Sequence, residues 1–366
     1  MKITRIIGAE CKLPLPRPIR LGPVEIKTRD FVALRLETDA GITGDALGYP
    51  RGTALSASAE RLAPLALGRD VHARRGVTED LLNAFINGRP TFVKAASLYD
   101  IALWDAAAKE VEQPLATLLG GGRTRAPVMV VAGYYPDVRP VADICDEVRR
   151  RVDEGYERIK IMIRGDDALA DLKLVEAAWD IAGPRLSVDA HWAWRTVAEA
   201  YRTCRTLDGI GLRFIEDPFG PNRSFLADRL QSMLATPLAI GEDLPDPQTI
   251  RQALDDVPIL RLDATTCGGV TAAVAAAEAA DSAGVAVLPH VFLPIHAQLA
   301  GALPQIEAVE YIPDDTEACP MFDLLEGEAG VTDGWVEIDQ SPGAGFWLDW
   351  QKVEDYATSS WTVEAD

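Results

Sequence analysis

Short apolar runs alternate with amphipathic stretches through the second half of the chain. Strand-like runs such as VMVVAGYY and RIKIMI are followed by helix-like segments, the first over residues 138–154 and the second over residues 167–181. The first run, near residue 127, and the last, near residue 308, are separated by seven intervals of about 26 residues, (308 − 127)/7. This alternation and repeat length predict an α/β fold with a TIM-like (β/α)7β barrel of parallel strands.

The pattern before and after this region is different. Residues 1–40 alternate as strands do, helical patterns dominate over residues 54–109, and LLGGG ends this part of the chain. We therefore predict an N-terminal α+β capping domain over residues 1–122 and the barrel over residues 123–318. The tail, residues 319–366, contains DGWVEI and PGAGFWLDW, which have strand and turn character. We expect this segment to pack back on the capping domain and complete it.

Ionisable side chains close five of the apolar runs, at successive intervals of 27, 26, 21 and 27 residues: Asp189, Glu216, Glu242, Asp263 and His290. Parallel barrels build their active sites from the carboxyl ends of their strands. One strand-end carboxylate alone is equally well explained as a helix cap or an arginine partner. Three at this interval, followed by a histidine, indicate an active site.

Asp189, Glu216 and Glu242 offer hard oxygen ligands on neighbouring strands, a set that suits Mg²⁺. Such a metal binds a substrate carboxylate and stabilises the enediolate that forms when the adjacent carbon loses its proton. The base must then be neutral near pH 7 and fixed in direction. His290 meets the first requirement, and Asp263 meets the second by accepting a hydrogen bond from the other ring nitrogen. The alternative for His290 is a buried, structurally satisfied histidine.

The composition of the chain excludes several classes of protein and of binding partner. The 366 residues exceed one barrel of roughly 250 residues and leave room for a further domain. A net charge of −20 argues against nucleic acid as a partner. Because no apolar run of about 18 residues and no signal-like start are present, we expect no membrane association and a cytoplasmic location. The five cysteines are scattered without a CxxC motif, which indicates reduced thiols and not a zinc site.

The chain resembles the mandelate racemase-like group of the enolase superfamily. The likeness runs over almost the whole length and rests on eight fragments in order: DIALWDAAAKEVEQPLATLLGG (100–121), VDAH (188–191), IEDP (215–218), GED (241–243), LDATTCGGVT (262–271), PHVF (289–292), VEY (309–311) and PGAGFWLD (342–349). The resemblance implies that Asp189, Glu216 and Glu242 are the Mg²⁺ ligands. It also implies that His290 and Asp263 form the catalytic dyad of the group. We further expect a homo-oligomer.

The second strand of the barrel departs from part of that family. Racemases of the group carry Lys-x-Lys there, with the second lysine as a base on the opposite face of the substrate. Without a gap, the first lysine falls on Lys160 and the second position is Met162; with an offset, Lys160 is the base itself. Thr266 stands where the cycloisomerase and amino-acid racemase branch has its catalytic lysine, which argues against that branch.

His191 distinguishes the chain in another way. Most relatives have Asn two residues after the first metal ligand, whereas this motif is Asp-Ala-His. Strand alternation places His191 on the same face as Asp189. The pattern resembles acid-sugar dehydratases, which use this histidine as the acid that protonates the departing hydroxyl. The alternatives are a polar residue of the barrel mouth or a hydrogen bond to the metal ligands. We expect no catalytic role for His72 or His296.

Specificity is expected from the N-terminal domain, whose loops cover the barrel mouth in this family. Arg17 and Arg20 in PLPRPIRLG, and Tyr49 and Arg51 in GYPRG, are candidates to bind substrate hydroxyls or a distal carboxylate. For any one of them, an exposed loop charge is the alternative.

The leading hypothesis is a Mg²⁺-dependent dehydratase of a sugar acid, a small-molecule carboxylate. Lys160 and Glu310 contact the substrate carboxylate, His290 takes the α-proton, and His191 helps the β-hydroxyl leave. A racemase, epimerase or cycloisomerase on the same scaffold, with Lys160 as second base, is the alternative. A catalytically silent scaffold is poorly supported because the ligands and the dyad are both intact.

Overall fold

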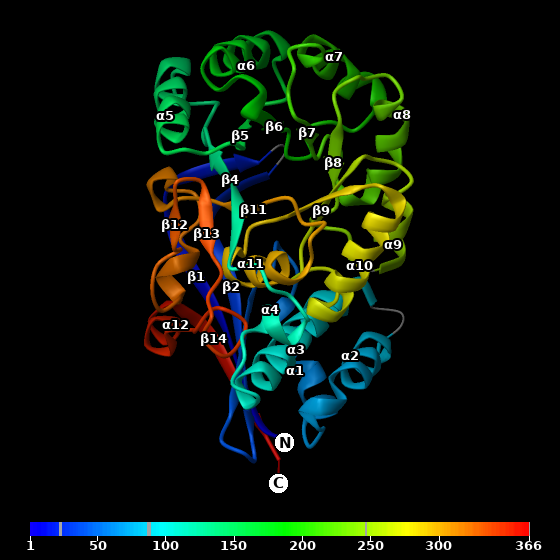
Figure 1. The fold of residues 1–366 in the computed structure, drawn as a ribbon, viewed down its shortest axis with the longest axis vertical. Helices are drawn as coiled ribbons and strands as arrows, with labels where there is room; N and C mark the ends of the chain where they lie inside the picture. The colour runs from blue at the N-terminus through cyan, green and yellow to red at the C-terminus, as the bar shows by residue number, and fades with distance from the viewer. Residues whose placement is uncertain (22–23, 86–88, 246, 366) are drawn as a thin grey trace.

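A computed structural model describes residues 1–21, 24–85, 89–245 and 247–365 of the chain. A parallel barrel with peripheral helices occupies one half of the molecule, and an antiparallel sheet with helices occupies the other (Figure 1). The predicted α/β fold, a (β/α)7β barrel with an N-terminal capping domain, is confirmed.

The capping sheet has the strand order β14-β1-β2-β3 and is antiparallel throughout. Its strands are β1 (Ile3–Leu21), β2 (Val24–Thr38), β3 (Thr43–Gly48) and β14 (Ala357–Glu364). The helices of this half are α1 (Leu55–Ala66), η1 (Val71–Ala73), α2 (Arg74–Asn83), α3 (Arg89–Glu110) and α4 (Leu115–Leu118). The long helix α3 packs against β3, α1 and α2, and it is buried on most sides, as expected for a helix without a polar face.

The barrel consists of parallel strands that pair in chain order, and β11 pairs with β4 to close the ring. These strands are β4 (Arg125–Ala132), β5 (Ile159–Met162), β6 (Leu186–Asp189), β7 (Ile215–Glu216), β8 (Leu238–Ile240), β9 (Ile259–Leu262), β10 (Ala286–Pro289) and β11 (Val309–Tyr311). The bridge between Val287 and Ile306 joins β10 to the segment before β11.

Helical segments connect these strands around the outside of the barrel (Figure 1). They are α5 (Val141–Asp153), α6 (Ala168–Ala182), η3 (Gly183–Arg185), α7 (Val197–Leu207), η4 (Pro221–Leu226), α8 (Ala227–Gln231), α9 (Pro247–Ala253), α10 (Gly269–Ala283) and α11 (Leu293–Ala302). Side-chain caps define where two of these helices begin: Asp167 caps α6, and Thr196 and Glu199 form a capping box on α7.

The C-terminal tail contacts both halves of the molecule. After η5 (Asp314–Thr316) and η6 (Met321–Leu324), the hairpin of β12 (Val331–Thr332) and β13 (Trp335–Glu337) pairs with β4 of the barrel. Helix α12 (Trp350–Tyr356) follows PGAGFWLD, and β14 then pairs with β1 of the capping sheet. The tail therefore adds one strand to the cap and one hairpin to the barrel.

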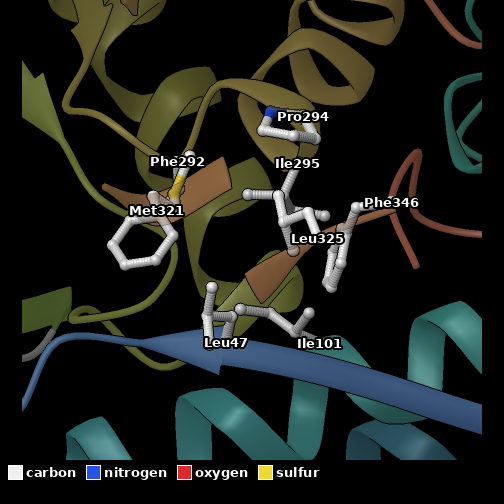
Figure 2. Close-up of a pocket in the computed structure, with 8 residues that line it drawn as sticks. All are labelled: Leu47, Ile101, Phe292, Pro294, Ile295, Met321, Leu325 and Phe346. Atoms are coloured by element: carbon white, nitrogen blue, oxygen red, sulfur yellow. The ribbon is translucent and has the colours of Figure 1, made fainter. Parts of the chain in front are cut away.

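An apolar junction joins the cap, the barrel and the tail beside the loop that carries His290 (Figure 2). It encloses only about 10 Å³ and is lined by Leu47, Ile101, Phe292, Pro294, Ile295, Met321, Leu325 and Phe346. Phe292 also contacts the Tyr49 ring, with 4.7 Å between the centroids. Because close-packed side chains resist displacement, this junction holds the loop after β10 against the cap.

Gly269, the first residue of α10, allows a close approach between barrel and cap. Its φ is +89°, and a Cβ there would lie 2.3 Å from the Cβ of Asp100 on α3. Any other residue would be both strained and in collision. The glycines of LDATTCGG therefore allow the cap to approach the strand end that carries Asp263.

Candidate active site

The ionisable residues singled out in the sequence meet at the carboxyl end of the barrel. Asp189 and Glu216 are the last residues of β6 and β7, Asp263 and His290 directly follow β9 and β10, and Glu242 follows β8 by two residues. All are buried, as are Lys160 in β5 and Glu310 in β11. The barrel register therefore brings together residues that lie up to 150 positions apart (310 − 160).

Lys160 lies at the centre of this cluster. Its Nζ is 3.0 Å from Asp189 Oδ2, 3.0 Å from Glu216 Oε1 and 2.6 Å from Glu310 Oε1. Burial opposes the charge, but the three carboxylates hold the pKa of Lys160 well above its usual value. A lysine surrounded in this way keeps its proton and is a poor general base.

Arg261 in β9 is a second buried cation that we did not anticipate from the sequence. Its Nε is 2.9 Å from Glu216 Oε1, and it also pairs with Glu310. The same guanidinium donates to the carbonyl oxygens of Leu288 and Pro289, at 2.8 and 3.1 Å. Arg261 thus links the carboxylate cluster to the strand that precedes His290. Two features of the sequence indicate that Arg261 belongs to the site. It lies two residues before Asp263, on the same face of the strand, and its charge interrupts an apolar run.

Glu216 and Glu310 contact the same two cations, but their pKa values shift in opposite directions. Glu310 receives a donor on both oxygens, including Val291 N–H at 3.0 Å, and Arg261 and Lys160 outweigh burial to lower its pKa to about 2. Glu216 Oε2 is buried and has no hydrogen-bond partner within the described ranges. Burial accordingly raises the pKa of Glu216 to about 8. A buried carboxylate oxygen without a donor is one that a cation would satisfy.

Glu242 is held by the capping domain. Arg51, on the loop after β3, lies 2.8 Å from Glu242 Oε1 and 2.5 Å from Asp243 Oδ2 through its NH1. Lys94 on α3 also contacts Asp243, at 3.3 Å. Within the residues that the structure describes, no three His, Cys, Asp or Glu side chains are arranged around one common point. In this arrangement Lys160 and Arg51 neutralise the three carboxylates predicted to bind metal.

His290 and Asp263 form a hydrogen-bonded pair. His290 Nδ1 is 2.9 Å from Asp263 Oδ2, while Asp263 Oδ1 accepts from the backbone N–H and the hydroxyl of Thr265, each at 2.7 Å. Burial acts against ionisation, but the hydrogen bonds from His290 and Thr265 lower the pKa of Asp263. Asp263 is therefore an ionised acceptor with a fixed orientation. Thr265 is a further residue of this arrangement that the sequence did not reveal.

His290 Nε2 has two neighbours, one that suits its unprotonated form and one that suits its protonated form. Arg51 NH2 lies 3.0 Å from Nε2 and can only donate, so this contact fits an unprotonated Nε2. Glu242 Oε2 lies 3.3 Å from the same atom and fits a protonated Nε2. Because Asp263 accepts from Nδ1 in both states, the ring can gain and lose a proton at Nε2 without reorientation.

His191 lies beside Asp189, but not through strand alternation. The chain turns sharply after β6, where His191 and Trp192 have φ values of +45° and +60°, and Asp189 Oδ1 accepts the backbone N–H of His191 at 2.9 Å. His191 Nδ1 is 3.4 Å from the same oxygen. Burial is the main effect on the pKa of His191 and lowers it. Left-handed non-glycine residues are costly and concentrate at functional sites.

His296 has a structural role. Its Nε2 accepts from Ala264 N–H at 3.1 Å, and its Nδ1 faces the Val291 carbonyl at 2.7 Å. The fully buried ring thus ties together the two loops that carry the His290–Asp263 pair. His72 is half-exposed, and its Nε2 lies 3.1 Å from Glu110 Oε2. Both residues belong to the capping domain and not to the ends of the barrel strands.

One cavity of about 1000 Å³ lies over the strand ends. Side chains of the barrel line it, including Lys160, Asp189, His191, Glu242, His290 and Glu310, and residues 24–30 of β2 and the loop carrying Tyr49 and Arg51 line it from the cap. Arg17 and Arg20 do not line it; they pair with Glu317 at 2.8 Å and Asp166 at 3.6 Å on the surface. The two candidates from GYPRG reach the cavity, and the two from PLPRPIRLG do not.

Comparison with known proteins agrees with this architecture. Residues 4–120 match the N-terminal domain of the mandelate racemase / muconate lactonizing enzyme family, and residues 143–352 match the enolase C-terminal domain-like family. The chain is 28% identical to D-xylonate dehydratase of Haloferax volcanii, over 91% of this chain and 87% of the relative. It is 30% identical to D-galactarolactone cycloisomerase of Agrobacterium fabrum, over 89% and 87%.

A solved structure of L-talarate dehydratase from Polaromonas sp. JS666, complexed with Mg and L-glucarate, superposes on the whole chain. The TM-score is 0.88 at 25% sequence identity, and all of both chains is covered. Dehydratases and a cycloisomerase thus share this fold, so the reaction depends on the site and not on the fold. The chain belongs to the mandelate racemase / muconate lactonizing enzyme family of the enolase superfamily.

Proposed function

We propose that this protein is a Mg²⁺-dependent dehydratase of a sugar acid, an aldonate or an aldarate. It removes the proton on the carbon next to the carboxylate and the hydroxyl on the following carbon, and releases a 2-keto-3-deoxy acid and water. The observation that carries the proposal is the pair of imidazoles in one cavity: His290, oriented by Asp263, and His191 beside Asp189. Elimination of water requires one base and one acid, and these rings supply both.

Asp189, Glu216 and Glu242 would hold the metal. Three carboxylates at the ends of consecutive barrel strands are a ligand set that suits Mg²⁺, and the buried, unpartnered Glu216 Oε2 is an atom that a cation would satisfy. Solved relatives contain magnesium, among them the L-talarate dehydratase and a racemase from Streptomyces coelicolor A3(2). When bound, Mg²⁺ supplies Lewis-acid stabilisation of the negative charge that develops on the substrate carboxylate, worth several kcal/mol of barrier.

His290 is the base of the proposed reaction. Asp263 accepts a hydrogen bond from Nδ1–H, which keeps the proton on Nδ1 and leaves the Nε2 lone pair toward the cavity. After Nε2 accepts the α-proton, Glu242 Oε2 at 3.3 Å is in position to stabilise the positive ring. The Arg51 guanidinium must move away from His290 Nε2 before substrate can approach this nitrogen. Arg51 can keep its ion pair with Asp243 when it does so.

His191 is the acid that protonates the departing hydroxyl. Because burial lowers the pKa of His191, its protonated form is a stronger acid than an exposed imidazolium. Lys160 contacts the substrate carboxylate from the floor of the cavity. The contact expected for Glu310 would need a protonated carboxyl, whereas Arg261 and Lys160 keep this group ionised, so Glu310 holds Lys160 in position instead. The Lys160 charge is the local cation that an anionic substrate needs in a protein of net charge −20.

Racemisation, epimerisation and cycloisomerisation are the competing reactions on this scaffold. Inversion of a stereocentre needs a second base on the opposite face. Lys160 is 2.6 Å from Glu310, a carboxylate outside the proposed metal ligands that favours its protonated form. Met162, at the position of the usual second base, carries a thioether that accepts no proton. Both observations favour elimination.

The test is a screen of an acid-sugar library in D₂O with Mg²⁺. We expect a keto acid, detected as its semicarbazone, from at least one aldonate or aldarate. Formation of the epimer alone, with deuterium incorporated and no keto acid, would contradict the dehydratase assignment and make Lys160 the second base.

A further inference from the structure

Arg29, on β2 of the capping sheet, is a guanidinium without a carboxylate. It lines the cavity over the strand ends, and its Nε donates to the Ala318 carbonyl oxygen at 2.7 Å. Its remaining N–H groups have no hydrogen-bond or ion-pair partner in the described part of the chain. Burial acts to lower the pKa of Arg29, but the nearby Tyr49, Tyr134 and Cys319 raise it overall, so the guanidinium stays charged.

The other cations with restricted exposure in this cavity are paired. Arg51 contacts Glu242 and Asp243, Lys94 contacts Asp243, and Lys160 contacts three carboxylates. Arg29 cannot relieve its isolation by losing a proton, because guanidinium stays charged at any physiological pH. Arg29 is partly exposed to the cavity and has no counter-charge there among the residues that the structure describes, so an anionic ligand would supply one.

The surroundings of Arg29 fix its orientation. The bond from Nε to the tail and the Tyr49 ring, whose centroid is 5.9 Å from the guanidinium carbon, hold one edge of the group. The edge formed by NH1 and NH2 is then left for a ligand, and this edge matches the two oxygens of a carboxylate. Burial raises the pKa of Tyr134, two residues after β4, and Arg29 and Lys160 both act to lower it. Arg29 and Lys160 therefore lie near the same part of the cavity, one on the cap and one in the barrel.

We propose that Arg29 binds the distal carboxylate of the substrate, so that the preferred substrates are dicarboxylic sugar acids and not their monocarboxylic counterparts. The proposal rests on the sugar-acid function above. Lys160 takes the carboxylate next to the reacting carbon, and Arg29 takes the carboxylate at the other end. The cavity of about 1000 Å³ has room for a six-carbon diacid between them.

The test compares matched pairs of six-carbon acids that differ only at C6, a carboxylate in one member and a hydroxymethyl group in the other. Binding of each stereoisomeric pair, such as glucarate and gluconate, is measured by calorimetry with Mg²⁺ present. We expect the unaltered protein to bind the diacid of its best pair more tightly, on the order of 10- to 100-fold, as expected for a charge-assisted bidentate contact. Arg29→Met should abolish this preference and leave binding of the monoacid unchanged.

Arg20→Met is the matched control, because Arg20 lies on the same hairpin but outside the cavity. It should keep the full preference, and Arg29→Lys should keep part of it. If Arg29→Met does not fold, as judged by its thermal unfolding, Arg29→Gln makes the same comparison. A protein without preference for any diacid, or an Arg29 variant that retains the preference, overturns the proposal. Binding and keto-acid formation are separate measurements, so failure of the dehydratase assignment would show only in the keto-acid screen.

Discussion

Replacement of Asp263 by Asn tests how the His290 ring is held. Thr265 donates two hydrogen bonds to Asp263 Oδ1, one of them from a backbone N–H that can never accept. In the Asp263→Asn variant the amide oxygen must therefore stay at the Oδ1 position, and the amide NH₂ must face His290 Nδ1. A donor at that position forces Nδ1 to carry the lone pair and moves the ring proton to Nε2. The base is then blocked at the atom that faces the cavity.

The expected loss is large because the substitution selects the wrong tautomer and does not merely weaken a bond. The same carboxylate-to-amide change in the His–Asp pair of serine proteases lowers kcat about 10⁴-fold. We expect a loss of about 10³- to 10⁴-fold in α-proton exchange for Asp263→Asn, or roughly 4 to 5.5 kcal/mol of barrier. Thr265→Val, which keeps the backbone donor, should lose less than about tenfold.

The measurement is exchange of the substrate α-proton with D₂O, followed by proton NMR at saturating acid and Mg²⁺. Asp100→Asn is the matched control, since it makes the same change in another fully buried aspartate away from the cavity. If Asp263→Asn exchanges within about tenfold of the unaltered protein, the orientation argument is wrong, whatever the overall reaction proves to be.

Three further predictions concern the metal, the acid and the pH dependence of stability. EDTA should abolish turnover and Mg²⁺ restore it, while Glu216→Gln should weaken Mg²⁺ binding, measured by calorimetry, by roughly 100-fold; full activity after exhaustive chelation would exclude the metal. His191→Asn should slow keto-acid formation about 10²- to 10⁴-fold but leave α-proton exchange intact, and parallel loss of both would remove His191 from the acid role. Burial raises the pKa of Asp100 to about 6, so the folded chain binds this proton more tightly than the unfolded chain does. Asp100 then contributes stability below about pH 4 that is lost as pH rises through 6, about 3 kcal/mol from (6 − 3.8) × 1.36. The difference in unfolding free energy between the unaltered protein and Asp100→Asn should fall over that range and stay constant above it, and parallel curves would contradict this.

Much of the barrel was predictable because period and patterning constrain it strongly. The helices expected over residues 138–154 and 167–181 are Val141–Asp153 and Ala168–Ala182. Asp189 and Glu216 end their strands as the apolar runs indicated. Parallel strands buried on both faces are continuous apolar runs, and the residue that ends each run marks the mouth of the barrel.

The contacts between cap and barrel were not predictable in the same way. That Arg51 reaches Glu242 and His290, whereas Arg17 and Arg20 stay on the surface, depends on how two domains dock. The left-handed turn at His191 also breaks the alternation on which its predicted direction rested. Arg261 interrupts an apolar run and could have been noticed in the sequence. Its partners Glu216 and Glu310, however, come close to it only when the barrel closes.

Strand β14 has a consequence for how the protein folds. Its register joins Arg5 to Glu364, so two segments 359 positions apart (364 − 5) share one ladder of hydrogen bonds. Until β14 has been synthesised, β1 has an unpaired edge, which is a site for wrong pairing and aggregation. Ordering of the cap therefore depends on residues made long after β1, and such long-range closure slows folding. A truncation after the barrel would release β1 as an open edge, even though every residue lining the cavity would still be present.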